Sequence, residues 1–426
     1  MKLFFKVIIL FMIVFNFRMP YVYNSVVLAD LIVVFYYLLM RKSVPFNYFY
    51  LRYNVIILAG TIILTGINIA FTVLHEQYFF TYDKRLILQF FMLSSFIFSL
   101  PLFIEDEEGE AYEKMSILIC YTFALQGLIH LTAYLYTPLG EYLYSMKGEG
   151  FNSYMVENGI DKFRGYALTG SIFFELPAAY GVACIMFFRL QLIEGQKYLS
   201  GLKAYIILFL LIAGISLSGR TGFIGAFIGL FLFSVFSFNK FTTWVRNTWK
   251  LVLAIAFALT FFYFLITPGQ RSRLSDEVFP FAFEAYYNYR DYGTLSTGSS
   301  DQLEKHYFPL RDETFLAGHG TVSGQGGFYP GSDAGYINVI VFGGIPYFLC
   351  LCIYQYLYCA APLFLTRRRD TQENKHDFLF FLSLFVYMFI LEYKADALGT
   401  QHITEVLLLA AGSSYMIRHY YQLEHG

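Results

Sequence analysis

The chain has 426 residues, of which 57% are hydrophobic and 14% are charged, and its formal net charge is −1. A mean hydropathy of +0.52 is too apolar for an ordinary soluble domain of this length. The near-neutral charge says nothing about nucleic acid, but the sequence has no basic tail to bind it, so we expect no nucleic-acid partner. The sequence predicts an all-α polytopic membrane protein, with residues 1–426 forming a single integral membrane domain.

A bilayer core needs about 20 apolar residues per helix, and this criterion predicts about twelve transmembrane helices. The first has Lys2 and Lys6 before its apolar stretch, as in a signal peptide, but no small-residue cleavage site comes after it, so we expect it to remain a helix. The predicted spans lie near residues 3–17, 22–40, 53–74, 86–104, 115–137, 168–188, 204–218, 222–237, 249–266, 333–363, 378–391 and 402–417.

The positions of the basic residues predict the orientation. If the N-terminus is cytoplasmic, 17 of the 30 Lys and Arg residues fall in short segments on that side, as the positive-inside rule requires. We therefore expect both termini in the cytoplasm and two longer periplasmic loops, at residues 138–167 and 268–332. Within the second loop, Phe279 to Tyr292 is rich in aromatic residues and is typical of an amphipathic helix on the membrane surface.

Two arginines lie where predicted loops meet the membrane on the outer side. Arg164 stands among glycines in the segment Phe163–Ser171, and Arg220 follows Ser218 and Gly219 in a short turn between two spans. Each arginine would serve equally as an interfacial anchor, but a rigid turn favours phosphate, which the guanidinium binds with two parallel donors. Arg271 and Arg273, at the start of the large loop, are further candidates for the same ligand.

A glycine-rich segment, Gly318–Gly327, precedes the tenth predicted span. Successive glycines allow several backbone N–H groups to face one anion. His319 has glycine on both sides, so we expect no apolar surface for its ring. Asp333 stands where the span begins and suits either an N-cap or a catalytic base.

Charged residues also gather between the last two predicted spans. Glu392 and Lys394 are followed by Asp396 and His402. Residues two apart do not share a helix face, so Glu392 and Lys394 need not pair. The cluster suits either a solvated helix end or a functional site.

Together these motifs resemble those of the O-antigen polymerase (Wzy) family, which is related to the O-antigen ligases. The resemblance rests on the Ser-Gly-Arg turn at Arg220, one large late outer loop, Ser332-Asp333-Ala334-Gly335-Tyr336 leading into Gly343-Gly344-Ile345-Pro346, and the late Glu392-Tyr393-Lys394. Related ligases commonly carry a His-Asn pair where this chain has Ser332-Asp333, which favours a polymerase.

The resemblance implies a metal-independent glycosyltransferase of the bacterial inner membrane, with no cofactor and an active site facing the periplasm. It would transfer an undecaprenyl-pyrophosphate-linked oligosaccharide onto another lipid-linked repeat unit, in the biosynthesis of a cell-surface polysaccharide of the lipopolysaccharide type. Arg164, Arg220, Arg271, Arg273 and Lys394 would bind the pyrophosphate, and Asp333, His319 or Glu392 would act in catalysis. Membrane lipid, a chain-length regulator and a flippase are the implied partners.

Other functional classes remain open. An O-antigen ligase would share the donor, and a polysaccharide flippase or transporter would share the many spans. Transporter sites commonly lie near the midplane between repeated halves, whereas no repeat is visible here and the charges gather at the outer face.

Overall fold

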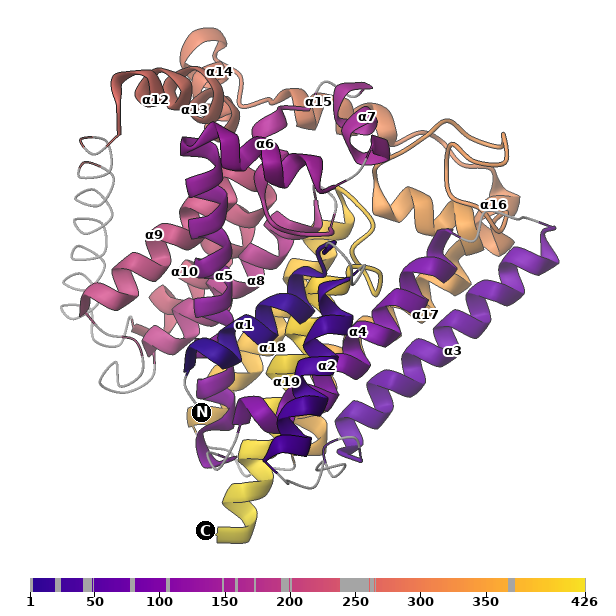
Figure 1. Cartoon of the computed structure of the whole chain (residues 1–426). Coiled ribbons are helices and arrows are strands. Elements are labelled where there is room, and N and C mark those ends of the chain that lie inside the picture. Colours follow the sequence, from indigo (N-terminus) through magenta and orange to yellow (C-terminus); the bar gives the residue numbers. More distant parts are fainter. Residues whose placement is uncertain are drawn as a thin grey trace. The chain divides into compact units, whose positions relative to one another are not determined.

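The computed structural model describes residues 3–19, 24–40, 48, 50–76, 81–104, 108–147, 149–157, 160–171, 174–192, 199, 201–237, 260, 264, 266–366 and 372–425. Every regular element in these ranges is helical, and none of them contains a strand (Figure 1). The chain divides into two compact units, which are described separately. Unit 1 comprises Met1–Ala29 and Glu113–Leu295, and unit 2 comprises Asp30–Tyr112 and Ser296–Gly426.

Unit 1 contains long apolar helices and several short helices. The helix α2 (Ser25–Leu39) runs across the division between the units, and α5 enters unit 1 at Glu113. The other elements are α1 (Leu3–Phe15), α5 (Ala111–Leu135), α6 (Thr137–Ser145), α7 (Glu149–Glu157), η3 (Lys162–Tyr166), α8 (Glu175–Leu192), α9 (Gly201–Ser218), α10 (Thr221–Ser237), α12 (Pro268–Arg273), the π-helical turn η6 (Leu274–Val278), α13 (Phe279–Ala282) and α14 (Glu284–Tyr292).

Unit 2 is built around four helices that pack against one another, namely α3, α4, α17 and α19. Its elements are α3 (Arg52–Leu74), α4 (Thr81–Ile104), η2 (Glu108–Glu110), α15 (Gly298–His306), α16 (Asp312–Ala317), α17 (Gly335–Leu365), α18 (Gln372–Glu392) and α19 (His402–His425).

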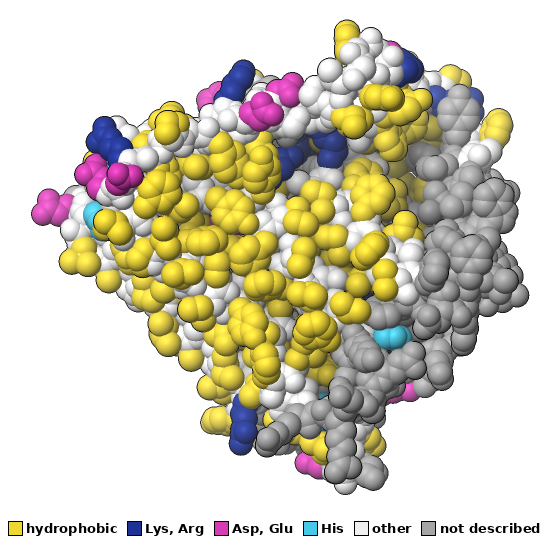
Figure 2. Space-filling view, turned by 180° about the vertical axis from the view of Figure 1, so that it is seen from behind, with side chains coloured by type: hydrophobic (Ala, Val, Ile, Leu, Met, Phe, Trp, Pro, Cys, Tyr) yellow, Lys and Arg dark blue, Asp and Glu magenta, His cyan; other side chains and the backbone are white. Residues whose placement is uncertain are grey.

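Five described helices are long and apolar enough to cross a membrane, which supports the predicted helical membrane protein. They are Arg52–Leu74, Tyr82–Ile104, Glu108–Leu135, Gly201–Ser218 and Gly335–Leu365. Hydrophobic side chains are widespread on the described surface of the face shown in Figure 2, and charged side chains are few there. The total of twelve spans stays a prediction, and the one expected at 249–266 lies outside the described residues except for 260, 264 and 266.

The helix expected at 168–188 begins later, at Glu175. The preceding backbone is held by the end of α1, because the N–H group of Gly170 donates to the Phe15 carbonyl at 2.8 Å. A Cβ atom on Gly170 would lie only 2.1 Å from the Asn16 carbonyl oxygen, so only glycine allows this approach. The non-helical segment separates Arg164, in η3, from the start of α8.

The predicted loop 268–332 contains helices, and the division between the units falls within it. The aromatic segment expected to form one helix is two short helices, α13 and α14, which meet at Phe283. The backbone of Phe283, with φ −114° and ψ 26°, departs from helical geometry and separates them.

The helix α17 is broken in its first half. Gly343 and Gly344 have non-helical backbone angles, and Gly344 has φ 65° and ψ −167°, a region used almost only by glycine. The N–H groups of His319 and Gly320 donate to the carbonyls of Val341 and Phe342 at 2.7 and 2.8 Å. The loop before α17 therefore supplies donors to carbonyls beside the break.

Candidate functional site

The predicted site residues are divided between the two units. Unit 1 holds the four arginines of the predicted pyrophosphate site, Arg164, Arg220, Arg271 and Arg273. Unit 2 holds Asp333, His319, Glu392 and Lys394.

In unit 1, Arg164 and Arg220 lie next to the same aromatic ring. The guanidinium carbons of Arg164 and Arg220 are 4.9 and 5.1 Å from the centre of the Phe281 ring in α13. The Nε atom of Arg164 donates to the carbonyl of Ser218 at 3.1 Å, which brings η3 to the turn between α9 and α10. Two residues that are 56 positions apart in the sequence thus form one cationic pair.

This turn leaves little room for side chains. A Cβ atom on Gly219 would lie 3.0 Å from the Pro177 side chain and 3.6 Å from a terminal nitrogen of Arg164. A Cβ atom on Gly222 would lie 2.7 Å from the Pro177 carbonyl oxygen. The two glycines let the Ser218–Arg220 backbone approach α8 and Arg164 closely.

Burial lowers the pKa of Arg164 to about 10, the neighbouring Asp161 opposes this shift, and the charge of Arg220 adds to it. Arg164 remains protonated at neutral pH, so the unit keeps two like charges close together. The side chain of Glu284 in α14 forms an ion pair with Arg220. An anion beside the two arginines would be stabilised by both charges.

A pocket of about 240 Å³, including the part open to solvent, adjoins Arg164. Lys147, Phe151, Arg164, Thr169, Ser171, Leu176 and Ser218 line it. Lys147 lies over the Phe151 ring at 4.8 Å, and burial lowers the pKa of this amine to about 7. Two cations and three hydroxyl-bearing residues suit the oxygen atoms of a phosphate group. Lys147 was not among the predicted site residues.

Arg271 and Arg273 lie on α12, and Arg273 is held at the end of α5. Its guanidinium carbon is 4.8 Å from the centre of the Tyr134 ring, and its nitrogens donate to Thr137 Oγ1 at 3.2 Å and to Glu277 at 3.5 Å. These contacts give Arg273 a role in joining α12 to the rest of unit 1.

In unit 2, His319 has the apolar contact that the sequence did not suggest. Its ring stacks on Phe328 at 4.4 Å with an angle of 10° between the planes. The expectation of a histidine without a packing surface was wrong, because the glycine turns fold Phe328 back onto it. Its Nε2 atom is 3.0 Å from Thr314 Oγ1, and burial lowers the pKa of the imidazole. His319 is therefore neutral at pH 7 and packed.

Asp333 does not cap α17. The N-cap is Ala334, which has no side-chain cap, and the Asp333 side chain is 78% exposed. Instead, the N–H group of Asp333 donates to His306 Nδ1 at 2.7 Å, and His306 Nε2 lies 3.9 Å from a carboxylate oxygen of Asp333. An accessible carboxylate beside an imidazole is a suitable proton acceptor.

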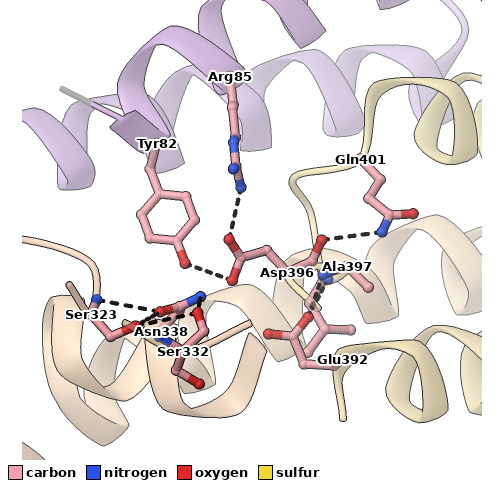
Figure 3. Close-up of polar contacts among 10 residues, drawn as sticks. Tyr82, Arg85, Ser323, Ser332, Asn338, Glu392, Asp396, Ala397 and Gln401 are labelled. Carbon is pink, nitrogen blue, oxygen red and sulfur yellow. Dashed lines mark hydrogen bonds and ion pairs between the residues drawn. The ribbon is translucent and has the colours of Figure 1, made fainter. Parts of the chain in front are cut away.

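Hydrogen bonds fix the backbone that leads to Asp333. Asn338 Nδ2 donates to the Ser332 carbonyl at 3.0 Å, and the N–H group of Ser332 donates to Ser323 Oγ at 2.8 Å (Figure 3). Ser323 Oγ in turn donates to Asn338 Oδ1. This closed set of contacts holds the entrance of α17 to the preceding glycine-rich segment.

The glycine-rich segment uses its N–H groups within the protein. Those of His319 and Gly320 bind α17, and those of Gly324 and Gln325 donate to the carbonyls of Tyr329 and Val322. The segment thus stabilises its own turns and the break in α17, and these four donors are engaged by protein acceptors.

Glu392 ends α18 and holds the following turn. One of its carboxylate oxygens accepts the N–H groups of Ala397 and Leu398 at 2.6 and 2.7 Å. Asp396 accepts from Arg85 at 2.8 Å and from Tyr82 OH at 3.1 Å, as Figure 3 shows. Lys394 lies in the turn itself and is partly buried. Here Glu392 is a buried support, and Asp396, whose side chain is 12% exposed, pairs with the more exposed Arg85.

No family model, curated protein or solved structure matches this chain.

Three residues that the sequence did not single out belong to these groups: Lys147, Glu284 and His306. Lys147 shares its pocket with Arg164, 17 residues away, whereas His306 and Glu284 lie 27 and 64 residues from Asp333 and Arg220, so no local motif contains both members of a pair. Among the described residues, no group of three or more His, Cys, Asp and Glu side chains could hold a metal ion. Unit 1 offers anion binding through cations, and unit 2 offers a carboxylate and an imidazole for proton transfer.

Proposed function

We propose that this protein is a membrane glycosyltransferase of the polysaccharide polymerase type. It transfers a glycan from undecaprenyl pyrophosphate to the end of a second lipid-linked repeat unit, at the periplasmic face of the inner membrane. The observation that carries the proposal is the convergence of Arg164 and Arg220 on Phe281 and the Ser218–Arg220 turn. The adjoining pocket with Lys147 adds a third cation.

The chemistry needs such a cluster because the leaving group is a pyrophosphate. Negative charge grows on the phosphate oxygen that was bonded to the sugar as the bond to the anomeric carbon breaks, and fixed cations stabilise that charge without rearranging. Guanidinium groups also orient the donor, since each can grip two phosphate oxygens. In this proposal Arg164, Arg220 and Lys147 bind the donor, and Arg273 supports the surrounding structure.

The acceptor hydroxyl must lose a proton, and unit 2 offers Asp333 for this step. Its carboxylate is 78% exposed, so solvent can carry the proton away, and His306 Nε2 lies 3.9 Å from it. His319 is stacked and hydrogen-bonded, and Glu392 holds a turn, so both support the structure in this proposal. A positioned general base accelerates such a reaction by about 10²-fold to 10⁴-fold.

The proposal is tested with purified protein and a defined lipid-pyrophosphate repeat unit. Wild-type protein should lengthen the glycan, and Arg220→Lys should reduce the rate by about tenfold or more, because lysine cannot reproduce the two-point grip. Arg290→Lys is the matched control, since Arg290 is 56% exposed and pairs with Asp291. Equal rates for wild type and Arg220→Lys would return Arg220 to the role of an interfacial anchor.

A deletion strain separates the polymerase from its rivals. Loss of a polymerase leaves single lipid-linked repeat units on the outer face, whereas loss of a ligase leaves long lipid-linked chains. Loss of a flippase leaves single units on the cytoplasmic face. Long lipid-linked chains in the deletion strain would exclude the proposal.

A further inference from the structure

The break in α17 lies beside buried polar side chains of unit 2. Gly343, where the backbone departs from helical geometry, lies against Tyr347, because a Cβ atom on Gly343 would be 2.5 Å from the Tyr347 Cβ atom. Tyr347 is fully buried, and its hydroxyl is near Asn68 of α3. Within the described residues, no atom is placed for a regular hydrogen bond to this hydroxyl. A buried polar atom of this kind calls for an explanation.

The last turns of α3 supply two more oxygen atoms. Asn68 is fully buried, and its Oδ1 atom has no hydrogen-bond partner among the residues that the structure describes. Thr72, which is 1% exposed, lies one turn further along the helix. Residues four apart lie on the same face of a helix, so the Asn68 amide and the Thr72 hydroxyl face the same part of the interior.

A buried carboxylate faces Thr72 from the next helix. Asp83, in the first turn of α4, is 3% exposed, and its Oδ2 atom accepts from Thr72 Oγ1 at 3.3 Å. Its Oδ1 atom has no hydrogen-bond partner in the described ranges, so it takes none of the N–H groups of the helix end. Arg85, two residues later, pairs with Asp396 at 2.8 Å. Asp83 itself forms no ion pair with any described residue.

We call Asn68, Thr72, Asp83 and Tyr347 the Asp83 cluster. It joins oxygen atoms of a carboxylate, an amide and two hydroxyl groups from α3, α4 and α17, and the charge of Asp83 acts on Tyr347. Buried charges in proteins are normally paired or bind a metal ion, because an isolated one is strongly destabilising. Oxygen atoms are the ligands of hard cations. A single carboxylate is neutralised by a monovalent cation, whereas a divalent one would leave a buried positive charge.

The broken helix favours a cation at the same place. The first half of α17, which begins at Gly335, ends at the break beside Tyr347, and the C-terminal end of a helix carries partial negative charge. Discontinuous membrane helices commonly hold Na⁺ at such ends. The cluster is also close to the end of α3, since Thr72 lies three residues before the C-cap His75. An ion therefore has a short way to enter from solvent.

We propose that the Asp83 cluster binds a sodium ion, which ties α3 and α4 to the second half of α17. The Asp83 carboxylate neutralises the ion, and the oxygens of Asn68, Thr72 and Tyr347 replace part of its water shell. Thr72 can keep its hydrogen bond to Asp83, because a hydroxyl that donates still has lone pairs for a cation. The small number of protein oxygens suits Na⁺ better than K⁺, a larger ion that needs more ligands.

The test is thermal melting of the purified full-length protein in detergent, in NaCl, KCl or choline chloride at equal ionic strength. No lipid-linked sugar is present, so the result is independent of the proposed polymerase activity. Wild-type protein should melt about 3 °C higher or more in NaCl than in choline chloride, as expected for a ligand at about ten times its Kd. KCl should have a much smaller effect, and radioactive Na⁺ should bind saturably.

Asp83→Asn keeps the size of the side chain and should abolish both Na⁺ binding and the response of the melting temperature. In choline chloride this variant should melt at or above the wild-type temperature, because an unpaired buried charge has been removed. A carboxylate that only supports the fold would instead be missed in all three salts. Asp301→Asn is the matched control, since Asp301 also stands in the first turn of a helix but is exposed. It should keep the full response to Na⁺.

Thr72→Val removes one ligand without changing the size of the side chain, and it should weaken Na⁺ binding by about tenfold. It serves as the second variant if Asp83→Asn does not fold. Equal wild-type melting in NaCl and choline chloride would overturn the proposal, as would an undiminished Na⁺ response in both variants. A shift in KCl as large as that in NaCl would overturn the assignment to Na⁺.

Discussion

The ion pair between Arg220 and Glu284 leads to an unusual expectation for substrate binding. If Arg220 binds a phosphate oxygen of the donor, the carboxylate of Glu284 competes for the same guanidinium. Glu284→Gln removes the competing charge and keeps the size of the side chain. Binding of the pyrophosphate should therefore become tighter, although a charged contact has been lost.

The burial of the Arg220–Glu284 pair sets the size of the expected change in affinity. The side chains of Arg220 and Glu284 are 20% and 29% exposed. Their interaction free energy should therefore lie between that of an exposed ion pair, about 0–1 kcal/mol, and that of a hydrogen bond to a charged group, about 1.5–3 kcal/mol. A value of about 1.4 kcal/mol corresponds to a tenfold change in Kd. Glu284→Gln should lower the Kd by about this factor.

The assay is calorimetric titration of purified protein with a short-chain polyprenyl pyrophosphate. Glu277→Gln is the matched control, because Glu277 lies in the same part of unit 1 but contacts Arg273 and Tyr134. Its Kd should stay close to that of the wild type. Weaker binding in Glu284→Gln would mean that Glu284 positions Arg220 for the donor, and the competition would be refuted.

Three further outcomes are expected. Because burial lowers the pKa of Lys147 to about 7, the charge of this amine is lost as the pH rises through that value, so donor affinity should fall between about pH 6 and 8. Lys147→Arg should remove this pH dependence, because arginine stays charged. The same pH dependence in wild type and Lys147→Arg would exclude Lys147 from the site. Asp333→Asn should lower turnover by about 10²-fold at unchanged protein level, whereas full turnover would exclude Asp333 as the base. Gly344→Ala should destabilise the protein by about 1–3 kcal/mol, measured by thermal melting in detergent. Gly66→Ala should not, because a Cβ atom there meets open space. Equal melting temperatures of the two variants would refute the strain expected at Gly344.

The membrane character of the chain could be predicted from the sequence, because apolar stretches long enough to span a bilayer leave few alternatives. Arg220 could also be selected, since a glycine and an arginine in a short turn between two apolar segments are a local signal. The pairing of Arg220 with Arg164 could not be predicted, because Phe281 brings them together from a third segment. Glu284 was equally hidden, as its partner lies 64 residues away.

Predictions from immediate neighbours were the least reliable. His319 has glycines beside it, but the chain returns after nine residues to place Phe328 on its ring. Asp333 has the residue type of an N-cap, but Asn338 donates a hydrogen bond to the Ser332 carbonyl, and the N-cap is Ala334, one residue later. By contrast, α3 buries Asn54, Thr61, Asn68 and Thr72. Their spacing places them on one side of a helix, so this inward polar face could have been predicted from the sequence.

The break in α17 also constrains how the protein is made. The backbone oxygens of Val341 and Phe342 receive donors from His319 and Gly320, which precede them in the chain and leave the ribosome first. A lipid environment offers no substitute donors, so the early half of this helix is complete only when the earlier segment has reached it. Deletions or insertions between residues 320 and 341 should therefore impair biogenesis even where the mature activity would tolerate them.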